Sequence, residues 1–233
     1  SEKALLDSLL VEIQNQEAVA LEVSTFQSDY AGPLALTTGT VQISDKASVE
    51  AALAAYDLLS TEAQTLLASE KALLDSLLLE IQAQEAIALE VSTFQSDHAG
   101  PLALTTGTVQ ISDKAAVEAA LAAYDLLSTE AQALLATEKA LLDSLLAEIL
   151  SLEGVTAEVS NFETTHAGVL AETTGTIQIS DKAAVEAALA AYDLLSTEAQ
   201  ALLATEKALL DSLLVEIQAQ EAIALEVSTF QTD

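Results

Sequence analysis

A unit of 68 residues is repeated along this chain of 233 residues, and this repetition limits the fold more than any other feature. Three copies occupy residues 1–68, 69–136 and 137–204, and a shorter fourth stretch covers residues 205–233. The first two copies agree at 62 of 68 positions, and the last 29 residues match the first 29 at 25 positions. Repeats of this length are supersecondary units that bury their apolar faces against their neighbours. Such an array adds length or valency to a protein, whereas an active site would need only one copy.

Each copy contains a short helical pattern followed by a longer one. In the second copy, residues 113–127 carry apolar side chains at the spacing of one helical face. Ser112 or Asp113 is expected to supply the N-cap oxygen of this helix. A second helix is predicted to begin at Thr129, because Gln132 stands three residues later and completes a capping box. The tight turn between the two helices makes them antiparallel.

The second helix has no stop signal over a long distance. Residues 61–97 contain neither glycine nor proline, and the first such residues are Gly100 and Pro101. An apolar stripe continues along the whole segment. The pattern therefore predicts a single helix of 37 residues. Its length would be about 55 Å, against about 22 Å for the short helix.

A short helix cannot cover the apolar stripe of a helix more than twice its length. We therefore predict an all-α fold of tandem three-helix bundles, in which each long helix closes one bundle and opens the next, as in a spectrin-like rod. The predicted repeat bundles span residues 1–79, 80–147 and 148–216, and residues 217–233 form a helical tail that opens a fourth repeat. Each repeat would advance the rod by about 30–35 Å.

Residues 100–111 connect each long helix to the next short one. Leu102 and Leu104 alternate with small or polar neighbours, and so do Val109 and Ile111. The alternation is compatible with a small β-hairpin and equally with an extended strap across the end of the bundle. Pro101 would suit the start of a strand or an edge position.

The third copy departs from the others in the middle of its long helix. Gly154 stands where the second copy has Ala86, and Thr156 replaces Ala88. A glycine inside a helix lowers its stability by about 1 kcal/mol relative to alanine. We expect this helix to be more bent, or packed differently, than the others.

No residue pattern points to catalysis or to a cofactor. His98 and His166 occupy equivalent positions, but the first copy has Tyr30 there, which could replace neither a general base nor a metal ligand. No serine is accompanied by a positioned histidine and acid, no stretch has the alternating ligands of an EF-hand, and cysteine is absent. The sequence therefore predicts no enzyme and no catalytic, cofactor-binding or metal-binding residues.

The carboxylates are numerous but spread around the predicted helices. Glu80, Glu85 and Glu90 are five residues apart, which takes successive side chains away from a shared face. Their expected environment is solvent. Lys71–Asp75 and Lys114–Glu118 are i, i+4 pairs and are expected to form weak ion pairs.

The charge excludes several kinds of partner. Asp and Glu number 37 against seven lysines and no arginine, and the net charge is −30. Such a chain repels nucleic acid and anionic membranes, although divalent cations could associate diffusely with its surface. A hydrophobic content of 51% argues against disorder. No uncharged apolar run is long enough to span a membrane.

Residues 113–135 read DKAAVEAALAAYDLLSTEAQALL, and Val109-Gln110-Ile111 precedes them. This stretch resembles the D-K-x-x-V-x-x-A-x-x-A-Y-D-x-L-(S/T)-x-E-x-Q-x-x-L pattern in tandem repeats of bacterial cell-surface proteins, mostly from Gram-positive bacteria. The resemblance implies an extracellular, wall-attached or S-layer-associated protein, whose repeats act as stalk or spacer modules and sometimes as adhesive ones. This chain departs from the pattern in having no arginine and no lysine after Gln132.

We therefore expect a non-enzymatic spacer of an extracellular bacterial surface protein, built as an acidic, semi-rigid helical rod. One alternative is an adhesin-type module that binds a host or matrix protein through an exposed apolar patch in each repeat. Phe94 and Tyr124 lie on the predicted core stripes and do not supply one. A second alternative is weak end-to-end self-assembly through the terminal helices. Because the sequence has neither a signal peptide nor an initiator methionine, we expect it to be part of a longer exported polypeptide.

Overall fold

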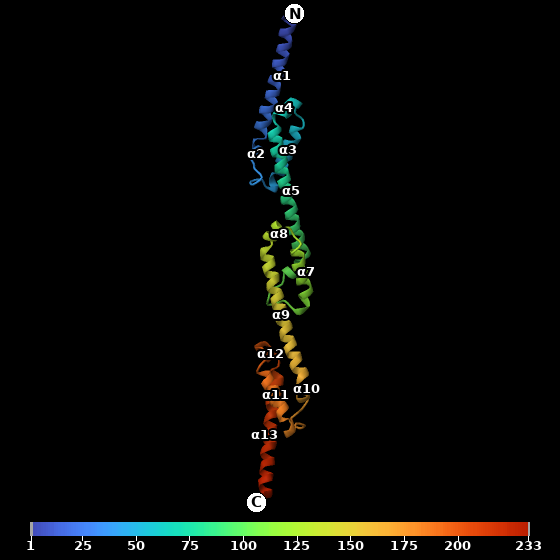
Figure 1. Ribbon diagram of the computed structural model, residues 1–233, viewed down its shortest axis with the longest axis vertical. Helices are drawn as coiled ribbons and strands as arrows, with labels where there is room; N and C mark the ends of the chain where they lie inside the picture. The colour runs from blue at the N-terminus through green and yellow to red at the C-terminus, as the bar shows by residue number, and fades with distance from the viewer. Residues whose placement is uncertain (1, 233) are drawn as a thin grey trace. The chain divides into compact units, whose positions relative to one another are not determined.

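The computed structural model describes residues 2–232, which are helical almost throughout and contain no β-strand (Figure 1). In the first copy and the start of the second, the α-helices are α1 (Glu2–Asp29), α2 (Ala31–Leu34), α3 (Lys46–Tyr56), α4 (Thr61–Leu66) and α5 (Ala68–Asp97). The same order recurs in α6 (Ala99–Leu102), α7 (Lys114–Tyr124), α8 (Thr129–Leu134), α9 (Ala136–Thr165), α10 (Ala167–Leu170), α11 (Lys182–Tyr192), α12 (Thr197–Leu202) and α13 (Ala204–Thr232). The 3₁₀ turns η1 (Ile43–Asp45), η2 (Ile111–Asp113) and η3 (Ile179–Asp181) precede α3, α7 and α11. The prediction of an all-α fold is confirmed.

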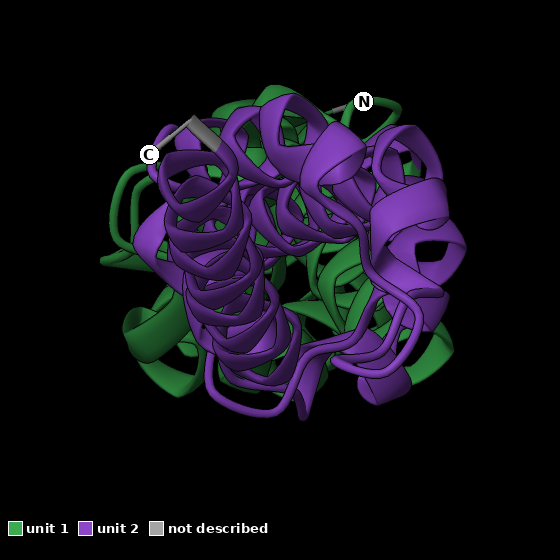
Figure 2. Ribbon diagram, turned by 90° about the horizontal axis from the view of Figure 1, so that it is seen from below, with its two compact units in different colours: residues 1–97, 123–136 green, residues 98–122, 137–233 purple. Residues whose placement is uncertain are grey.

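The chain divides into two compact units, shown in different colours in Figure 2. One contains the residues up to 97 together with 123–136, and the other contains 98–122 and the residues from 137 onward. The predicted repeat boundaries after residues 79, 147 and 216 stay predictions.

Each unit has a core made by the last turns of one long helix, a connecting segment, a short helix and the first half of the next long helix. In the first unit the buried core side chains are Phe26, Val41, Val49, Ala52, Leu67, Leu74, Leu77 and Ile81. In the second unit they are Phe162, Val169, Ile177, Val185, Ala188, Leu203, Leu210, Leu213 and Ile217. All of these except Val169 stand exactly two repeat lengths after a core residue of the first unit. The two cores are therefore built from equivalent positions of the repeat.

The helix predicted over residues 61–97 is interrupted at Leu67, so this prediction is wrong at its start. α4 ends at Leu66 and α5 begins at Ala68, while Leu67 adopts φ −98° and ψ 18°. The side chain of Leu67 is fully buried in the core, which fixes the chain at this point. From there α5 continues for 30 residues, about 45 Å, and passes through Leu79 without a reversal.

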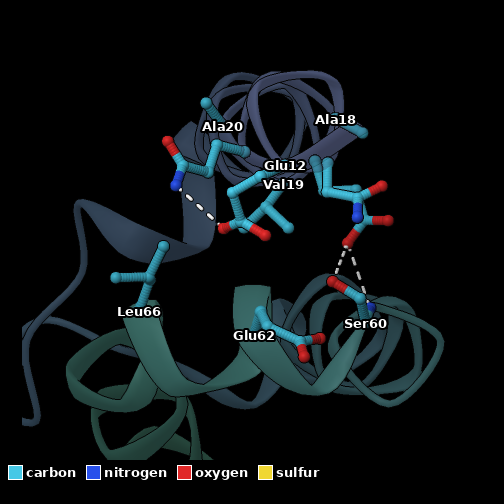
Figure 3. A pocket seen from close by; sticks show the side chains of 10 residues that line it. Glu12, Ala18, Val19, Ala20, Ser60, Glu62 and Leu66 are labelled. Atoms are coloured by element: carbon cyan, nitrogen blue, oxygen red, sulfur yellow. Dashed lines mark hydrogen bonds between the residues drawn. The ribbon is translucent and has the colours of Figure 1, made fainter. Parts of the chain in front are cut away.

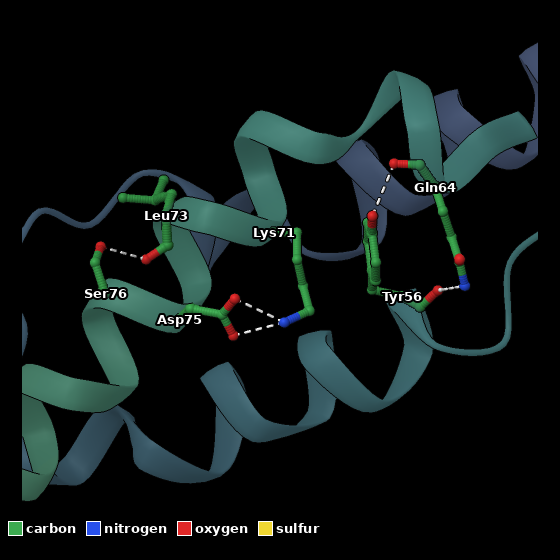
Figure 4. A network of polar contacts seen from close by, with 6 residues as sticks. All are labelled: Tyr56, Gln64, Lys71, Leu73, Asp75 and Ser76. Carbon is green, nitrogen blue, oxygen red and sulfur yellow. Dashed lines mark hydrogen bonds and ion pairs between the residues drawn. The ribbon is translucent and has the colours of Figure 1, made fainter. Parts of the chain in front are cut away.

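A pair of reciprocal hydrogen bonds stabilises the interruption (Figure 4). The hydroxyl of Tyr56 donates to the carbonyl oxygen of Gln64 at 2.7 Å, and the Gln64 side-chain amide donates to the Tyr56 carbonyl oxygen at 3.1 Å. The tyrosine hydroxyl thus donates a hydrogen bond to a backbone carbonyl oxygen close to a helix end, where carbonyl groups lack partners within the helix. Tyr124 with Gln132 repeats the arrangement.

The helix caps differ from those predicted. Ser128, not Thr129, is the N-cap of α8, and its hydroxyl accepts the N–H of Ala131 at 3.3 Å. Gln132 does not form the predicted capping box, because the third helical residue after the Ser128 cap is Ala131 and the N–H of Ser128 donates to Glu90. A capping box lies earlier in the chain, where the carboxylate of Asp113 accepts the backbone N–H of Gln110 at 2.9 Å. Asp113 thus caps η2, and α7 follows directly from it.

The predicted hairpin alternative is not found, since residues 100–111 form no strand, and we call this connection between the long and short helices the strap. Pro101 lies within the short helix α6 and not at a strand start. A tight turn follows, in which the N–H of Val109 donates to the carbonyl oxygen of Thr105 at 2.9 Å and the hydroxyls of Thr105 and Thr108 are 3.0 Å apart. Val109 is buried, which fastens the strap.

Gly154 does not interrupt α9, which runs from Ala136 to Thr165, while the packing differs at Leu152, which cannot make the hydrogen bond of Gln84 to the connecting segment. An added Cβ at Gly154 would meet no atom within 4 Å, so packing does not require a glycine there. The hydroxyl of Thr156 bonds the Leu152 carbonyl oxygen at 2.8 Å and lies along the helix.

Candidate functional site

The middle of α5 contacts the first copy on its N-terminal side. Ile81 belongs to the first core, and the side-chain amide of Gln84 donates to the Val41 carbonyl oxygen at 3.0 Å. Glu85 forms an ion pair with Lys46, at the start of α3, with 2.8 Å between Nζ and Oε2. Up to Glu85, therefore, α5 is fastened to the strap and short helix of the first copy.

The next turns of the same helix contact the second copy. The carboxylate of Glu90 accepts both the backbone N–H and the hydroxyl of Ser128, at 2.9 and 2.7 Å. The ring of Phe94 packs edge-on against Tyr124 with 6.2 Å between ring centroids. Only residues 86–89 separate the last of the first-copy contacts from the first of the second-copy contacts. We call residues 81–94 of α5 the shared segment.

The second unit contains the same arrangement in α9, at residues 149–162. Lys114 pairs with Glu153 at 2.7 Å, Glu158 accepts the N–H and hydroxyl of Ser196 at 2.9 and 2.7 Å, and Phe162 packs edge-on against Tyr192 at 6.2 Å. The carboxylate–serine contact recurs in α1, where Glu22 accepts hydrogen bonds from the N–H and the hydroxyl of Ser60. The lysine–glutamate ion pair recurs in α13, where Glu221 pairs with Lys182. The contacts thus follow the repeat.

Comparison of the copies within the chain identifies the same residues. Between residues 147 and 172, 14 of the 26 positions differ from the second copy. The counterparts of four of the five contact residues of the shared segment are nevertheless unchanged: Ile149, Glu153, Glu158 and Phe162. Gln84 is an exception, because Leu152 stands in its place and cannot donate a hydrogen bond. The substitutions therefore spare the contacts that join the long helix to two successive copies.

The polar contacts perturb the pKa of both kinds of charged group. Hydrogen bonds from the hydroxyl and the backbone N–H of Ser128 lower the pKa of Glu90 below its ordinary value, and Ser60 and Ser196 lower the pKa of Glu22 and Glu158 in the same way. A hydrogen bond to Glu85 raises the pKa of Lys46 above its ordinary value. Each contact therefore favours the charged form of its group.

Two sequence predictions about charge need correction. Glu85 and Glu90 are not simply solvated, since one pairs with a lysine and the other binds a helix N-cap. Lys114 pairs with Glu153 of α9 and not with Glu118. The predicted pair of Lys71 and Asp75 is confirmed, with 2.6 Å between Nζ and Oδ1 (Figure 4).

The histidine positions lie beside the aromatic contact. His98 and His166 precede the short helices α6 and α10, and the ring of His166 lies 4.9 Å from that of Phe162. Tyr30 lies 5.1 Å from Phe26 in the same way. An aromatic ring is the property that these three side chains share, which agrees with a structural role. Within residues 2–232, no three His, Cys, Asp or Glu side chains are grouped so that they could hold a metal ion.

A groove of about 570 Å³ lies between α1 and α4 (Figure 3). Its lining includes Glu12, Val19, Glu62 and Leu66, and the bond between Glu22 and Ser60 crosses it. The Ser60 hydroxyl and the Glu22 carboxylate meet in this groove, but the hydroxyl is also the N-cap acceptor of α4, and the lowered pKa of Glu22 makes its carboxylate a weaker base. We assign it no chemistry.

None of the helices described in residues 2–232 combines the length and the apolar character needed to cross a membrane. Comparison of the chain with family models, curated proteins and solved structures yields no match. The resemblance to surface repeats of Gram-positive bacteria therefore stays a prediction.

A long helix shared by two successive bundles was predicted from the sequence, but the residues of its contacts were not. Its partners are 38 and 39 residues apart, as in Glu90 with Ser128 and Lys46 with Glu85. Helical periodicity examines neighbours three and four residues apart and does not detect such pairs. These contact residues could have been found by comparing the copies, because they are unchanged in the third copy while many neighbouring residues differ.

Proposed function

We propose that this chain is a non-enzymatic spacer, in which tandem three-helix bundles share their long helices and form an acidic, semi-rigid rod. The shared segment is the observation that carries the proposal. One continuous helix contacts the short helix of one copy and the N-cap of the next within a few residues, so no flexible linker separates the two sets of contacts.

The stiffness of such a spacer has a physical origin in this segment. Bending between copies would have to break helical hydrogen bonds in residues 86–89, or separate Glu85 from Lys46 or Glu90 from Ser128. In linear repeat proteins each unit is stabilised by its neighbours, so local bending is opposed by both copies. A net charge of −30 also opposes lateral collapse and aggregation.

The repeated DKAAVEAALAAYD stretch supports a location at a bacterial cell surface. In that setting the rod would hold another part of the protein away from the cell. The location is part of the proposal and rests on the resemblance alone.

Small-angle X-ray scattering tests the spacer proposal. A rod at least about 100 Å long has a radius of gyration near 30 Å, whereas a compact globule of this chain length has about 17 Å. We expect a radius of gyration near the larger value, and we expect it to stay the same when the protein is diluted further. Two glycines inserted between Ile87 and Ala88 provide the matched variant, which should broaden the distance distribution without loss of helix. A compact particle would contradict the proposal.

A second candidate function, end-to-end association, is favoured by uncovered apolar faces on α1 and α13. Leu6 and Leu9 of α1 are exposed, although their counterparts Leu74 and Leu77 are fully buried. At the other end Phe230 is exposed, although its counterpart Phe94 is buried. Light scattering should show a mass that rises with concentration, and Leu6→Glu with Leu9→Glu should suppress the rise. A constant monomer mass at high concentration would exclude this function.

A further inference from the structure

A leucine at the same place in each copy projects into solvent. Leu58, Leu126 and Leu194 are each 88% exposed, in the turn that follows α3, α7 and α11. A single exposed leucine is ordinary in a soluble protein. Three equivalent leucines on one chain form a repeated apolar feature, which is the sign expected of a binding module.

Packing does not explain why these leucines are retained. Residues 112–136 and 180–204 are identical, including their exposed side chains. In the neighbouring long helix, by contrast, exposed positions have changed, as in Asp97 to Thr165 and Gln95 to Glu163. The turn thus keeps a solvent-facing leucine where a polar side chain would be compatible with the fold.

A groove lies beside this turn in both the first and the third copies. In the third copy it has a volume of about 210 Å³, and its apolar and aromatic lining is Phe162, His166, Ala191, Leu194 and Leu195. In the first copy it has about 490 Å³, and its apolar and aromatic lining is Leu21, Phe26, Tyr30, Ala55 and Leu59, with Leu58 next to that lining and outside it. We call each turn with its groove a corner.

The charge around the corner selects the kind of partner. Glu22 and Asp29 line the groove of the first copy, and Asp57 precedes Leu58. Six of the seven lysines are engaged in ion pairs. At this acidic groove a basic segment would be attracted more strongly than an equally acidic part of a second copy.

We propose that each corner docks a basic protein segment that presents leucine-like or phenylalanine-like side chains between lysines or arginines. One apolar side chain of the segment enters the groove, and the exposed leucine packs against the segment's apolar face. The flanking cations face the acidic surface. The exposed leucine recurs in all three copies and the groove in the first and the third, so the binding is multivalent, and this inference does not depend on the spacer function.

The test uses the full chain and a synthetic amphipathic helical peptide of about 15 residues, made only of leucine and lysine. Binding is measured by fluorescence anisotropy at about 0.15 M salt, where weak long-range attraction is screened. The variant Leu58→Ser/Leu126→Ser/Leu194→Ser keeps the net charge. It should bind the peptide about ten-fold more weakly than the wild type. A tenfold change in the dissociation constant corresponds to the burial of only a modest apolar area, which the exposed leucines can supply.

The matched control is Val11→Ser/Leu79→Ser/Val215→Ser, which removes three other exposed apolar side chains at a different repeated position. It should bind like the wild type, and circular dichroism should show equal helix content in all three proteins. A peptide in which serine replaces leucine should bind both variants equally weakly.

Three outcomes would overturn the proposal. They are equal affinity of the corner variant and the wild type, no saturable binding of the leucine-lysine peptide, and a change of oligomeric state in the corner variant alone. The last would make a second copy the occupant.

Discussion

Phe94 and Phe230 have nearly identical sequence surroundings and opposite environments. The stretches EVSTFQSD and EVSTFQTD differ at one position, yet Phe94 is 3% exposed and Phe230 is 87% exposed. Phe94 packs against Tyr124 of the next short helix, in the shared segment. Replacing each phenylalanine by alanine therefore compares the loss of a buried contact between copies, at Phe94, with the loss of a solvent-exposed ring, at Phe230.

We predict that Phe94→Ala lowers the free energy of unfolding by about 3–5 kcal/mol, the usual cost of removing a buried phenylalanine. Phe230→Ala should change it by less than about 0.5 kcal/mol, as surface substitutions do. In a chain of this size, 1 kcal/mol shifts the melting temperature by about 2–4 °C. The expected shift for Phe94→Ala is thus on the order of 10 °C.

Circular dichroism at 222 nm during thermal unfolding measures the effect, in dilute protein so that α13 stays uncovered. Because linear repeats can unfold in more than one step, the comparison uses the first transition. Equal melting temperatures for the wild type and Phe94→Ala would refute the reasoning, since Phe94 could then not join the two copies. A large loss in Phe230→Ala would show that α13 is covered in solution.

Three further predictions concern acid, salt and Gly154. Because the folded-state pKa values of Glu22, Glu90 and Glu158 are lowered, their stabilising contribution is present above the ordinary value of 4.5 and is lost as the pH falls through the folded pKa. Urea midpoints should therefore decrease in acid, and less steeply in the triple Glu→Gln variant; parallel curves would contradict this role. Moderate salt or millimolar divalent cations should raise the melting temperature by screening self-repulsion, and a flat response between low and physiological ionic strength would count against it. Gly154→Ala should stabilise α9 by about 1 kcal/mol, since the site is helical and open; a lower melting temperature would show that the glycine is needed.

The repeat and its apolar period were sufficient to predict the all-α class and part of the core, although Leu66 on the predicted stripe is exposed. Leu74, Leu77 and Ile81 lie on the predicted stripe and are fully buried. This succeeds because burial depends on local periodicity, which a sequence displays directly. The same period predicted that α5 would continue through Leu79, as it does.

The interruption at Leu67 could not be predicted from local signals. No glycine or proline marks it, and the residues around it favour helix. It depends on the burial of Leu67 and on hydrogen bonds from Tyr56 to Gln64, which exist only after the short helix has packed. The contacts of Glu85 and Glu90 were missed for the same reason, because their partners are distant in the sequence.

The continuity of the shared segment is tested most directly by the distance between two spin labels placed on either side of it. Glu62→Cys in α4 and Glu130→Cys in α8 are exposed positions in the same unit, and the chain has no other cysteine. Double electron–electron resonance should give one narrow distance distribution, which the two glycines inserted after Ile87 should broaden. A distribution that is already broad in the uninserted chain would contradict a rigid helix shared by two copies.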